Sequence, residues 1–342
     1  MVHKRCINLE KNWMFFNGAL DKGTNHISFC CAKEASNIRT TLCDDPEETL
    51  QNYMRLKQQI INESIRLAAE GGTSDCFYYN TCSRCAGFKE SIESTMSDDA
   101  LIHFICYGMT PAPCQAKCIY CSQNLIERRK YNKELDEAGH QLIFKHMEYF
   151  KEKGLFAKDI LFNIASGEIT IHPYKNKLYE IVGDASAGWL TNCFSYNKEI
   201  SNNLQSNPQS YILFSMDSGN AKTWKKIKGI NNFYEVKENI KRYTHEANDS
   251  YQIWLKYIVL PGINDDIENI HAFIQFAVEN KLKRIDISRN RYIKEIKDDH
   301  VTGAALLAAL AYKNNLKFSF MFYSADELGK IVTVANYAAD KM

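Results

Sequence analysis

The sequence predicts an α/β protein whose parallel strands are joined by crossover helices. From residue 100 onward, short apolar segments alternate with longer segments in which apolar residues recur at three- and four-residue steps. This alternation is typical of parallel sheets with helices on their faces. About six or seven strand–helix units predict a partial TIM-like (β/α)6 barrel over residues 98–342, preceded by a small cysteine-rich α+β domain over residues 1–97.

The N-terminal domain is expected to contain a hairpin followed by one long helix. Trp13–Phe16 and His26–Phe29 are the two strand-like segments, and Asn17-Gly18 is a hairpin turn signal. Asp44-Asp45-Pro46 supplies an acidic cap and a proline for a first helical turn. The spacing of apolar residues then predicts a helix from Glu47 to Ala69.

The polar segment Lys89–Asp99 is expected to be a linker, and the barrel follows it. The expected strands are Leu101–Tyr107, Asp159–Ala165, Gly188–Phe194, Tyr211–Met216, Tyr251–Leu260, Arg284–Ser288 and Lys317–Tyr323. The expected helices are Glu134–Lys153, Tyr174–Val182, Glu199–Gln205, Ala221–Ile227, Phe233–Ala247, Ile267–Asn280, Thr302–Asn314 and Asp326–Ala339. In such barrels the chemistry lies at the carboxyl ends of the strands.

Composition narrows the class of protein. The net charge is +1, from 42 basic and 41 acidic residues, which gives no reason to expect a nucleic acid or an anionic membrane as a partner. No apolar run has the length of a membrane span, and the N-terminus lacks a signal-type segment, so we expect a cytoplasmic protein. Twelve cysteines in a reducing compartment indicate metal binding rather than disulfides.

Three of these cysteines form a C-x3-C-x2-C run directly after the first expected barrel strand: Cys114, Cys118 and Cys121. Thiolates are the usual ligands of iron–sulfur clusters, and three ligands leave one iron of a [4Fe–4S] cube open to an exogenous ligand. The alternative is a zinc site or a closed cluster that takes a distant fourth ligand, such as Cys106.

With Tyr120 as the aromatic residue before its third cysteine, this run resembles the signature of the radical S-adenosylmethionine (SAM) superfamily. The resemblance implies that the three cysteines hold a [4Fe–4S] cluster whose open iron binds SAM. It also implies cleavage of SAM to a 5′-deoxyadenosyl radical, with electrons from a donor such as flavodoxin or ferredoxin. We expect an oxidoreductase or isomerase that oxidises, cross-links or epimerises a peptide or a small sugar-like metabolite.

Polar residues at other strand ends match further parts of the family pattern. Ser166-Gly167-Glu168 stands where the family has a Gly-Gly-Glu motif that binds the SAM amino group, with Ser166 in place of the first glycine. Ser215 and Asp217 resemble a Ser-x-Asp strand end that contacts SAM. An ordinary turn and a helix cap are the alternatives for these two segments. The resemblance implies these cofactor contacts: Tyr120, Ser166, Gly167, Glu168, Ser215, Asp217 and, after the sixth strand, Asn290.

The N-terminal cysteines predict a second metal site. A cysteine before the hairpin, one after it and a C-x2-C pair beyond the long helix resemble the SPASM and twitch auxiliary-cluster domains, although in the family this domain usually follows the barrel. On that resemblance the ligands of a second [4Fe–4S] cluster are Cys6, Cys30, Cys82 and Cys85, with Cys31 and Cys76 as alternatives. A zinc site with the same four thiolates is the other interpretation.

Two further features have an ordinary and a functional interpretation. Cys193 is expected in the core, and its alternative is a hydrogen-atom donor that faces the barrel lumen. The basic run Lys222–Lys228 is expected to be a solvated helix face, and its alternative is a site for an anionic substrate. For the whole chain, the alternatives are a radical SAM methyltransferase, an activase of a glycyl-radical partner and a zinc-stabilised binding protein.

Overall fold

The computed structural model describes residues 3–19, 24–29, 39–70, 88–91, 100–108, 112–121, 133–290, 292–293 and 295–341. The chain divides into two compact units. Unit 1 comprises Met1–Ala112, Arg129–Gly167 and Tyr174–Ser186. Unit 2 comprises Pro113–Arg128, Glu168–Pro173 and Ala187–Met342. Each unit is described by itself below.

Unit 1 contains a sheet that combines N-terminal strands with the first two strands of the expected barrel. Its strands are β2 (Trp13–Ala19), β3 (Thr24–Ser28), β4 (Arg39–Thr41), β6 (Ile102–Tyr107) and β7 (Phe156–Ile164). They are arranged in the order β7-β6-β2-β3-β4. The β6 strand pairs in parallel with both β7 and β2, whereas β2–β3 and β3–β4 are antiparallel. The predicted boundary at residue 97 stays a prediction, and unit 1 takes residues from both sides of it.

The hairpin lies where the sequence predicts it, but its turn does not. Asn17 and Gly18 are strand residues that pair with His26 and Asn25, so the prediction of a turn at Asn17-Gly18 is wrong. The ladder continues past the buried aromatic segment to Ala19, because the two backbones remain in register. The connection at residues 20–23 is outside the described residues.

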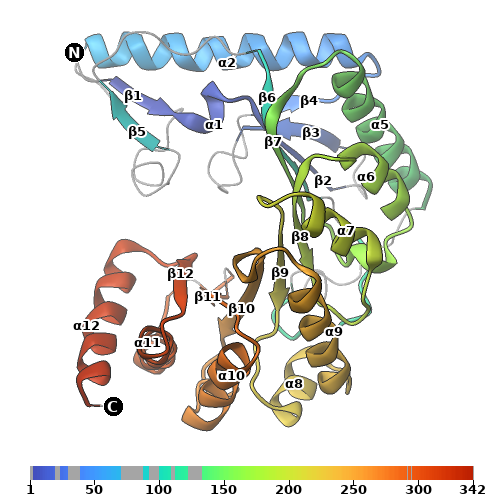
Figure 1. Cartoon of the computed structure of the whole chain (residues 1–342). Coiled ribbons are helices and arrows are strands. Elements are labelled where there is room, and N and C mark those ends of the chain that lie inside the picture. Colours follow the sequence, from blue (N-terminus) through green and yellow to red (C-terminus); the bar gives the residue numbers. More distant parts are fainter. Residues whose placement is uncertain are drawn as a thin grey trace. The chain divides into compact units, whose positions relative to one another are not determined.

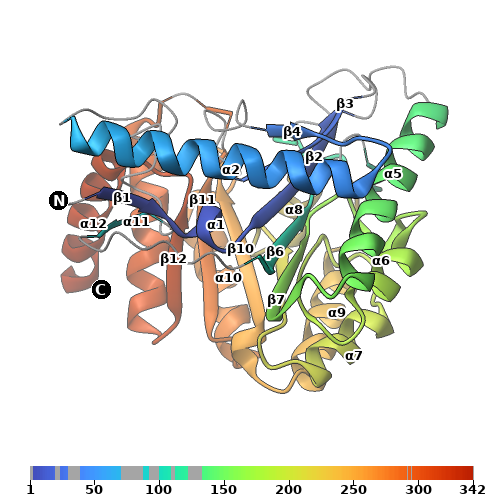
Figure 2. The same cartoon turned by 90° about the horizontal axis from the view of Figure 1, so that it is seen from above.

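The long N-terminal helix is confirmed as α2 (Pro46–Ala69). Asp45 Oδ1 accepts a hydrogen bond from the Glu47 backbone N–H at 2.9 Å, which satisfies one of the free donors of the first turn. Tyr53 of this helix is buried, and its hydroxyl donates to the Trp13 carbonyl oxygen at 2.9 Å. These contacts fix α2 along the N-terminal strands (Figure 2).

Further elements complete unit 1. The strands β1 (His3–Cys6) and β5 (Phe88–Ser91) form a separate antiparallel pair in which Cys6 lies opposite Phe88. The expected linker therefore begins with a strand, and its later residues 92–99 are outside the described part of the chain. The helices are α1 (Ile7–Glu10), α5 (Lys133–Glu152) and α6 (Lys175–Val182).

Unit 2 is built from five parallel strands in chain order. They are β8 (Ser186–Thr191), β9 (Tyr211–Ser215), β10 (Ile253–Val259), β11 (Arg284–Arg289) and β12 (Lys317–Met321). The helices that alternate with them are α7 (Lys198–Ser206), α8 (Ala221–Lys228), α9 (Phe233–Glu246), α10 (Ile267–Glu279), α11 (Asp298–Lys313) and α12 (Ala325–Lys341). Two short 3-10 helices are η3 (Ile169–Ile171) and η4 (Ser250–Gln252).

The helices of unit 2 begin at side chains that cap them and bury one face on the strands. Asn197, Asn220 and Asp266 start α7, α8 and α10, and each accepts a hydrogen bond from the backbone N–H three residues later. The alanine-rich α11 contacts β10, β11 and β12, and α12 contacts α11 (Figure 1). Small side chains allow this close helix–sheet approach.

These strands and helices confirm an α/β fold with a predominantly parallel sheet, as the sequence predicts. Closure into a partial barrel stays a prediction. Among the described residues, no helix has both the length and the apolar character needed to cross a membrane.

Candidate active site

The three-cysteine loop belongs to unit 2, where backbone hydrogen bonds fix it at three points. The Glu168 backbone N–H donates to the Pro113 carbonyl oxygen at 2.8 Å, just before the first cysteine. Further along the loop, Lys117 N donates to Lys228 O at 2.9 Å and Ile119 N donates to Ile227 O at 3.0 Å. The loop is therefore held both by the segment before η3 and by the C-terminal end of α8.

The thiols of this loop have the chemistry that an iron–sulfur cluster requires. Cys114, Cys118 and Cys121 form no disulfide, and electrostatic interactions link Cys114 to Cys118 and Cys118 to Cys121. Burial raises the pKa of Cys114 to about 11 and also raises the pKa of Cys118. Bound cationic metal reverses this effect, because it stabilises the thiolate directly. The donor set therefore fits a cluster with three protein ligands.

A site for a single metal ion differs from a cluster site in the arrangement of its ligands. Among the described residues, no group of three or more His, Cys, Asp or Glu side chains has the arrangement of a site for one metal ion. A cubane binds its thiolates at separate corners, so its ligands do not need to converge on one point. The proposed alternative ligand Cys106 lies on β6, where its Sγ contacts Asn163 Oδ1 at 3.8 Å.

The side chain of Glu168 accepts hydrogen bonds from residues near the strand ends next to this loop. Its side chain is fully buried and accepts four hydrogen bonds. Oε1 accepts from Thr170 N at 3.2 Å, Thr170 Oγ1 at 2.8 Å and Thr191 Oγ1 at 2.7 Å, and Oε2 accepts from Asn192 N at 2.6 Å. Burial raises the pKa of Glu168, and these donors oppose that shift by stabilising the carboxylate.

Asn192 joins Glu168 to the cysteine loop. Its backbone N–H donates to Glu168, while its side-chain Nδ2 lies 3.7 Å from Cys114 Sγ and 3.5 Å from Gln115 Oε1. A cysteine ligand that accepts a hydrogen bond has less negative charge on its sulfur, and such bonds tune clusters. Asn192 was not predicted as a site residue, because the sequence placed it inside the expected strand Gly188–Phe194, whereas β8 ends at Thr191.

A buried ion pair lies on the other side of the loop. Lys228 Nζ contacts Asp217 Oδ2 at 2.6 Å and the Tyr120 hydroxyl oxygen at 2.7 Å, and the Tyr120 hydroxyl also donates to Asp217 Oδ2. Asp217 Oδ1 accepts from the Ile258 backbone N–H at 2.7 Å. The side chains of Lys228 and Asp217 are 1% and 0% exposed. We call Tyr120, Asp217 and Lys228 the buried ion-pair network.

The expectation of a solvated basic helix face is wrong for Lys228. Burial alone lowers the pKa of Lys228, but the attraction of Asp217 and of the cysteine thiols raises it overall, so the lysine is charged. Lys228 occupies the last turn of α8, where its cation also interacts favourably with the helix dipole. The only feature of the sequence that sets Lys228 apart from the other lysines of this helix is its position directly before Gly229, where the helix ends.

Two asparagines support Asp217, and neither was assigned a role from the sequence. Asn264 Nδ2 donates to the carbonyl oxygens of Asp217 at 2.9 Å and Ile258 at 2.8 Å. Asn269 Oδ1 accepts from Gly219 N at 2.9 Å, which closes the loop after β9 onto α10. Gly219 must be glycine here, because a Cβ atom would lie 2.0 Å from the Asn269 carbonyl oxygen.

Comparison with known proteins identifies the domain in which these residues lie. Residues 112–274 match the sequence model of the Radical SAM superfamily. This stretch, slightly less than half of the chain, is similar to a radical SAM domain. It includes the three cysteines, Glu168, the buried ion-pair network and both supporting asparagines.

Solved structures share the fold of this chain. Streptococcus suis SuiB bound to S-adenosylmethionine is 13% identical with a TM-score of 0.50, over 83% of this chain and 60% of that one. SuiB bound to the precursor peptide SuiA is 15% identical with a TM-score of 0.50, over 86% of this chain and 57% of that one. The chain thus matches about three fifths of the length of each SuiB chain. Comparison with curated proteins gives no match.

The other predicted SAM contacts are not all brought together by described contacts. Gly167 has φ +56°, which favours glycine directly before Glu168, and Ser166 is buried. Ser215 ends β9 and is half-buried. Asn290 follows β11 and its Oδ1 accepts from the Tyr292 backbone N–H at 3.1 Å, as in an ordinary turn. Their roles in the radical SAM domain stay predictions.

Cys193, which the sequence predicts in the core with a hydrogen-atom donor as the alternative, is fully buried just beyond β8. Burial raises the pKa of its thiol, and the nearby Glu168 charge adds to that shift. Its backbone has φ +60°, and its N–H donates to Thr191 Oγ1 at 2.9 Å. This environment is typical of a core cysteine.

Most of the predicted auxiliary ligands are outside the described residues: Cys30, Cys31, Cys76, Cys82 and Cys85. Cys6 is described and ends β1.

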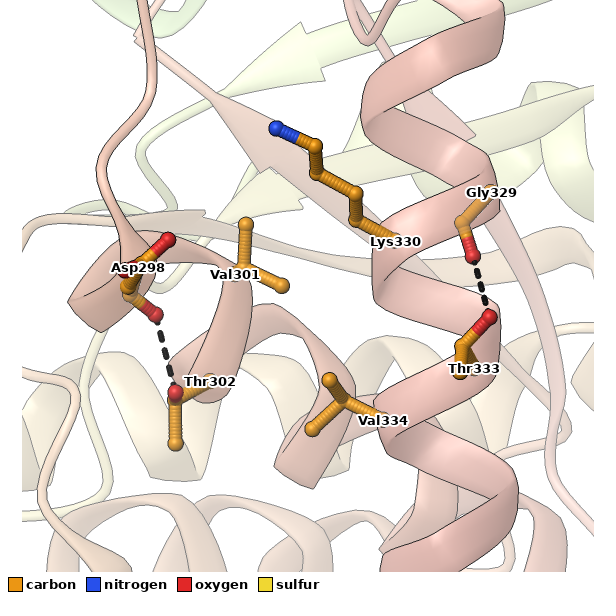
Figure 3. A pocket seen from close by; sticks show the side chains of 7 residues that line it. All are labelled: Asp298, Val301, Thr302, Gly329, Lys330, Thr333 and Val334. Carbon is orange, nitrogen blue, oxygen red and sulfur yellow. Dashed lines mark hydrogen bonds between the residues drawn. The ribbon is translucent and has the colours of Figure 1, made fainter.

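A hollow of about 470 Å³ lies between α11 and α12 and is shown in Figure 3. Its lining contains Asp298, Thr302 and Lys330 but no cysteine and no predicted SAM contact, so we assign it no role in the radical SAM chemistry.

Proposed function

We propose that the protein is a radical SAM enzyme whose catalytic cluster is bound by Cys114, Cys118 and Cys121. The observation that carries this proposal is the placement of the three thiols, none of which is in a disulfide. They lie on one loop that is fixed by hydrogen bonds at Pro113, Lys117 and Ile119, inside the matched radical SAM region. When bound, the cluster supplies the electron that cleaves SAM.

The residues around the loop then have separate tasks. Glu168 is fully buried, and its Oε2 has only one donor, Asn192 N, among the described contacts. A carboxylate oxygen accepts more than one hydrogen bond, so Oε2 has the capacity to accept from the SAM amino group. Ser166, Gly167, Ser215 and Asn290 complete the proposed SAM contacts, with Tyr120 beside the cluster.

We propose a peptide as the substrate, modified by oxidation or cross-linking. The support is the shared fold with SuiB, which was crystallised with its precursor peptide SuiA. A small sugar-like metabolite is the competing substrate class, and epimerisation is the competing reaction. An electron donor such as flavodoxin or ferredoxin is part of the same proposal.

The decisive experiment is anaerobic reconstitution with iron and sulfide, followed by addition of dithionite and SAM. We expect 5′-deoxyadenosine by mass analysis in the wild type and none in Cys118→Ala, because that variant loses a cluster ligand. Cys43→Ala is the matched control, since the Cys43 thiol contacts Thr41 and Asn52 and lies outside the matched radical SAM region. Wild-type yields of 5′-deoxyadenosine in Cys118→Ala would refute the proposal.

We also propose a second [4Fe–4S] cluster held by Cys6, Cys30, Cys82 and Cys85, with Cys31 and Cys76 as alternative ligands. Its support is the pairing of β1 with β5. Cys6 lies opposite Phe88 in that pair, and only two residues separate Phe88 from Cys85 in the sequence. The pairing of β1 with β5 therefore puts Cys6, the first predicted ligand, next to the segment that follows Cys85, the last predicted ligand, in the sequence. A zinc site remains the competing interpretation for the same thiols.

A further inference from the structure

The buried ion-pair network contains two charged side chains of a kind that is almost never fully buried unless it is paired. It places a lysine and an aspartate where almost no water reaches them, with side chains 1% and 0% exposed. Taking two charges out of water costs several kcal/mol per ion in proteins, about as much as their mutual attraction returns. Packing alone would be served as well by apolar side chains of similar size.

The hydrogen bonds of the network connect it to the cysteine loop and to the strand ends beside that loop. Tyr120 lies between Cys118 and Cys121 and contacts both ions. The backbone oxygen of Lys228 accepts from Lys117 N at 2.9 Å, so side chain and main chain of the same residue both hold the loop. Gly229 lets the helix end approach: a Cβ atom there would lie 2.9 Å from Lys117 Cβ.

The ammonium group of Lys228 lies 5.2 Å from the centre of the ring of Tyr120, which stands between Cys118 and Cys121 in the loop. Its positive charge opposes the effect of burial on the pKa of Cys118 by favouring the thiolate. A buried charge is screened less by water and salt than an exposed one, so its field acts more strongly on neighbouring groups. The net charge around a cluster is one of the factors that set its reduction potential.

We propose that Lys228 is a positioning residue for the cysteine loop and that its charge favours the reduced form of the cluster. This inference rests on the proposed function, because it assumes a cluster on Cys114, Cys118 and Cys121. Reduction adds one electron, and therefore one negative charge, to a site that already contains three thiolates. Lys228 stabilises that added charge, while Asp217 holds Lys228 in place and opposes part of its field.

The test uses the reconstituted protein, with reduced cluster measured by electron paramagnetic resonance at a series of fixed potentials. Cys82 and Cys85 are replaced by alanine throughout, so that only one cluster is observed. In Lys228→Met the ratio of reduced to oxidised cluster at a fixed potential should fall about tenfold, as expected for loss of one nearby, weakly screened charge. Lys228→Arg keeps the charge and should stay within about threefold of the parent protein.

The sign of the effect separates an electrical role from a purely structural one. Asp217→Asn removes the opposing charge, so the reduced fraction at a fixed potential should rise. The double variant Lys228→Met/Asp217→Asn leaves the net charge unchanged and should return toward the parent value. Damage to the fold alone would move all three variants in the same direction.

Each outcome decides the inference. An unchanged reduction curve in Lys228→Met, or shifts of the same sign in Lys228→Met and Asp217→Asn, would overturn it. If Lys228→Met takes up no iron, the Asp217→Asn curve decides alone, and a reduced fraction that falls or stays constant overturns the inference. A wild-type protein that binds a cluster but forms no 5′-deoxyadenosine contradicts the proposed function and leaves this charge test standing.

Discussion

At the scale of single residues, Glu168 shows how the site depends on partners from different parts of the chain. Thr170 lies two residues after Glu168, but Thr191 and Asn192 come from the end of β8. All four donors point at one buried carboxyl group and replace the water that it loses on burial. The residue predicted from its motif thus depends on partners that the motif does not contain.

Glu168→Gln should destabilise the protein and weaken its SAM binding. The amide NH2 must occupy one oxygen position, where it faces an N–H or O–H donor, and such a mismatch costs about 1–3 kcal/mol of unfolding free energy. Thr170→Val removes one hydroxyl donor only and should cost about 1 kcal/mol. Urea unfolding of the metal-free proteins measures the free energy of unfolding of both variants. Equal losses of unfolding free energy in Glu168→Gln and Thr170→Val would contradict this account of Glu168.

His140 predicts how stability depends on pH. It is 1% exposed among Tyr107, Phe144 and Tyr174, and burial lowers its pKa to about 4. The unfolded chain therefore binds the proton more tightly than the folded one, so stability is full above pH 6.5 and is lost as the pH falls toward 4. The contribution of His140 to this loss is about 2 kcal/mol between pH 7 and pH 5.

Urea unfolding at pH 7 and pH 5 checks this contribution. His140→Gln cannot titrate in this range, so its stability should fall less between the two pH values than that of the wild type, by about 2 kcal/mol. His245→Gln is the matched control, because His245 is exposed on α9. The same loss in His140→Gln as in the wild type would rule out His140 as the source.

At the scale of elements, the junction between α8 and the cysteine loop is the part of the site with the tightest geometry. Gly229 ends α8 in the left-handed region with φ +71°, and its N–H donates to Lys225 O. Because the loop backbone contacts Ile227 and Lys228 just before this glycine, the end of the helix determines where the cysteines lie.

Gly229→Ala should damage this junction beyond the ordinary cost of a left-handed alanine. Gly154→Ala is the matched control, since Gly154 has φ +67° and a Cβ atom there would meet no other atom within 4 Å. Both variants lose about 1 kcal/mol through backbone strain. Only Gly229→Ala must also displace Lys117, so we expect a further loss of stability and reduced iron uptake there alone. Iron assay and thermal unfolding measure the two effects, and full iron uptake in Gly229→Ala would contradict the prediction.

Local patterns predicted most elements, and particular residues explain the exceptions. Asp45-Pro46 and the apolar period identified α2 to within one residue, because caps and periodicity are local signals. Asn17-Gly18 failed as a turn because pairing with β3 outweighs the local preference of the dipeptide. Lys228 failed as a surface residue because its partner Asp217 lies eleven positions earlier, outside α8, which periodicity does not reveal.

At the scale of the whole molecule, the N-terminal segment is integrated with the first expected barrel strand within unit 1. Met14 pairs in parallel with Ile105, and Phe16 with Tyr107, so β2 continues the sheet from β6. A parallel pairing between segments about ninety residues apart leaves no local trace in the sequence. For this reason the hairpin was predictable as a hairpin, whereas its place beside β6 was not.

The iron content of the whole chain tests whether the N-terminal cysteines form a second cluster. With two four-iron clusters, Cys82→Ala/Cys85→Ala should remove about half of the iron and leave the other cluster in place. Cys114→Ala/Cys118→Ala should remove a similar share, and combining the four substitutions should leave almost none. Cys43→Ala controls for the loss of a thiol as such, because Cys43 contacts Thr41 and Asn52 and is not among the predicted ligands. Anaerobic iron and sulfide assays per mole of chain give the result. Zinc without sulfide in the Cys114→Ala/Cys118→Ala protein would assign the N-terminal thiols to a structural zinc ion, and unchanged iron in Cys82→Ala/Cys85→Ala would remove these two cysteines from the ligand set.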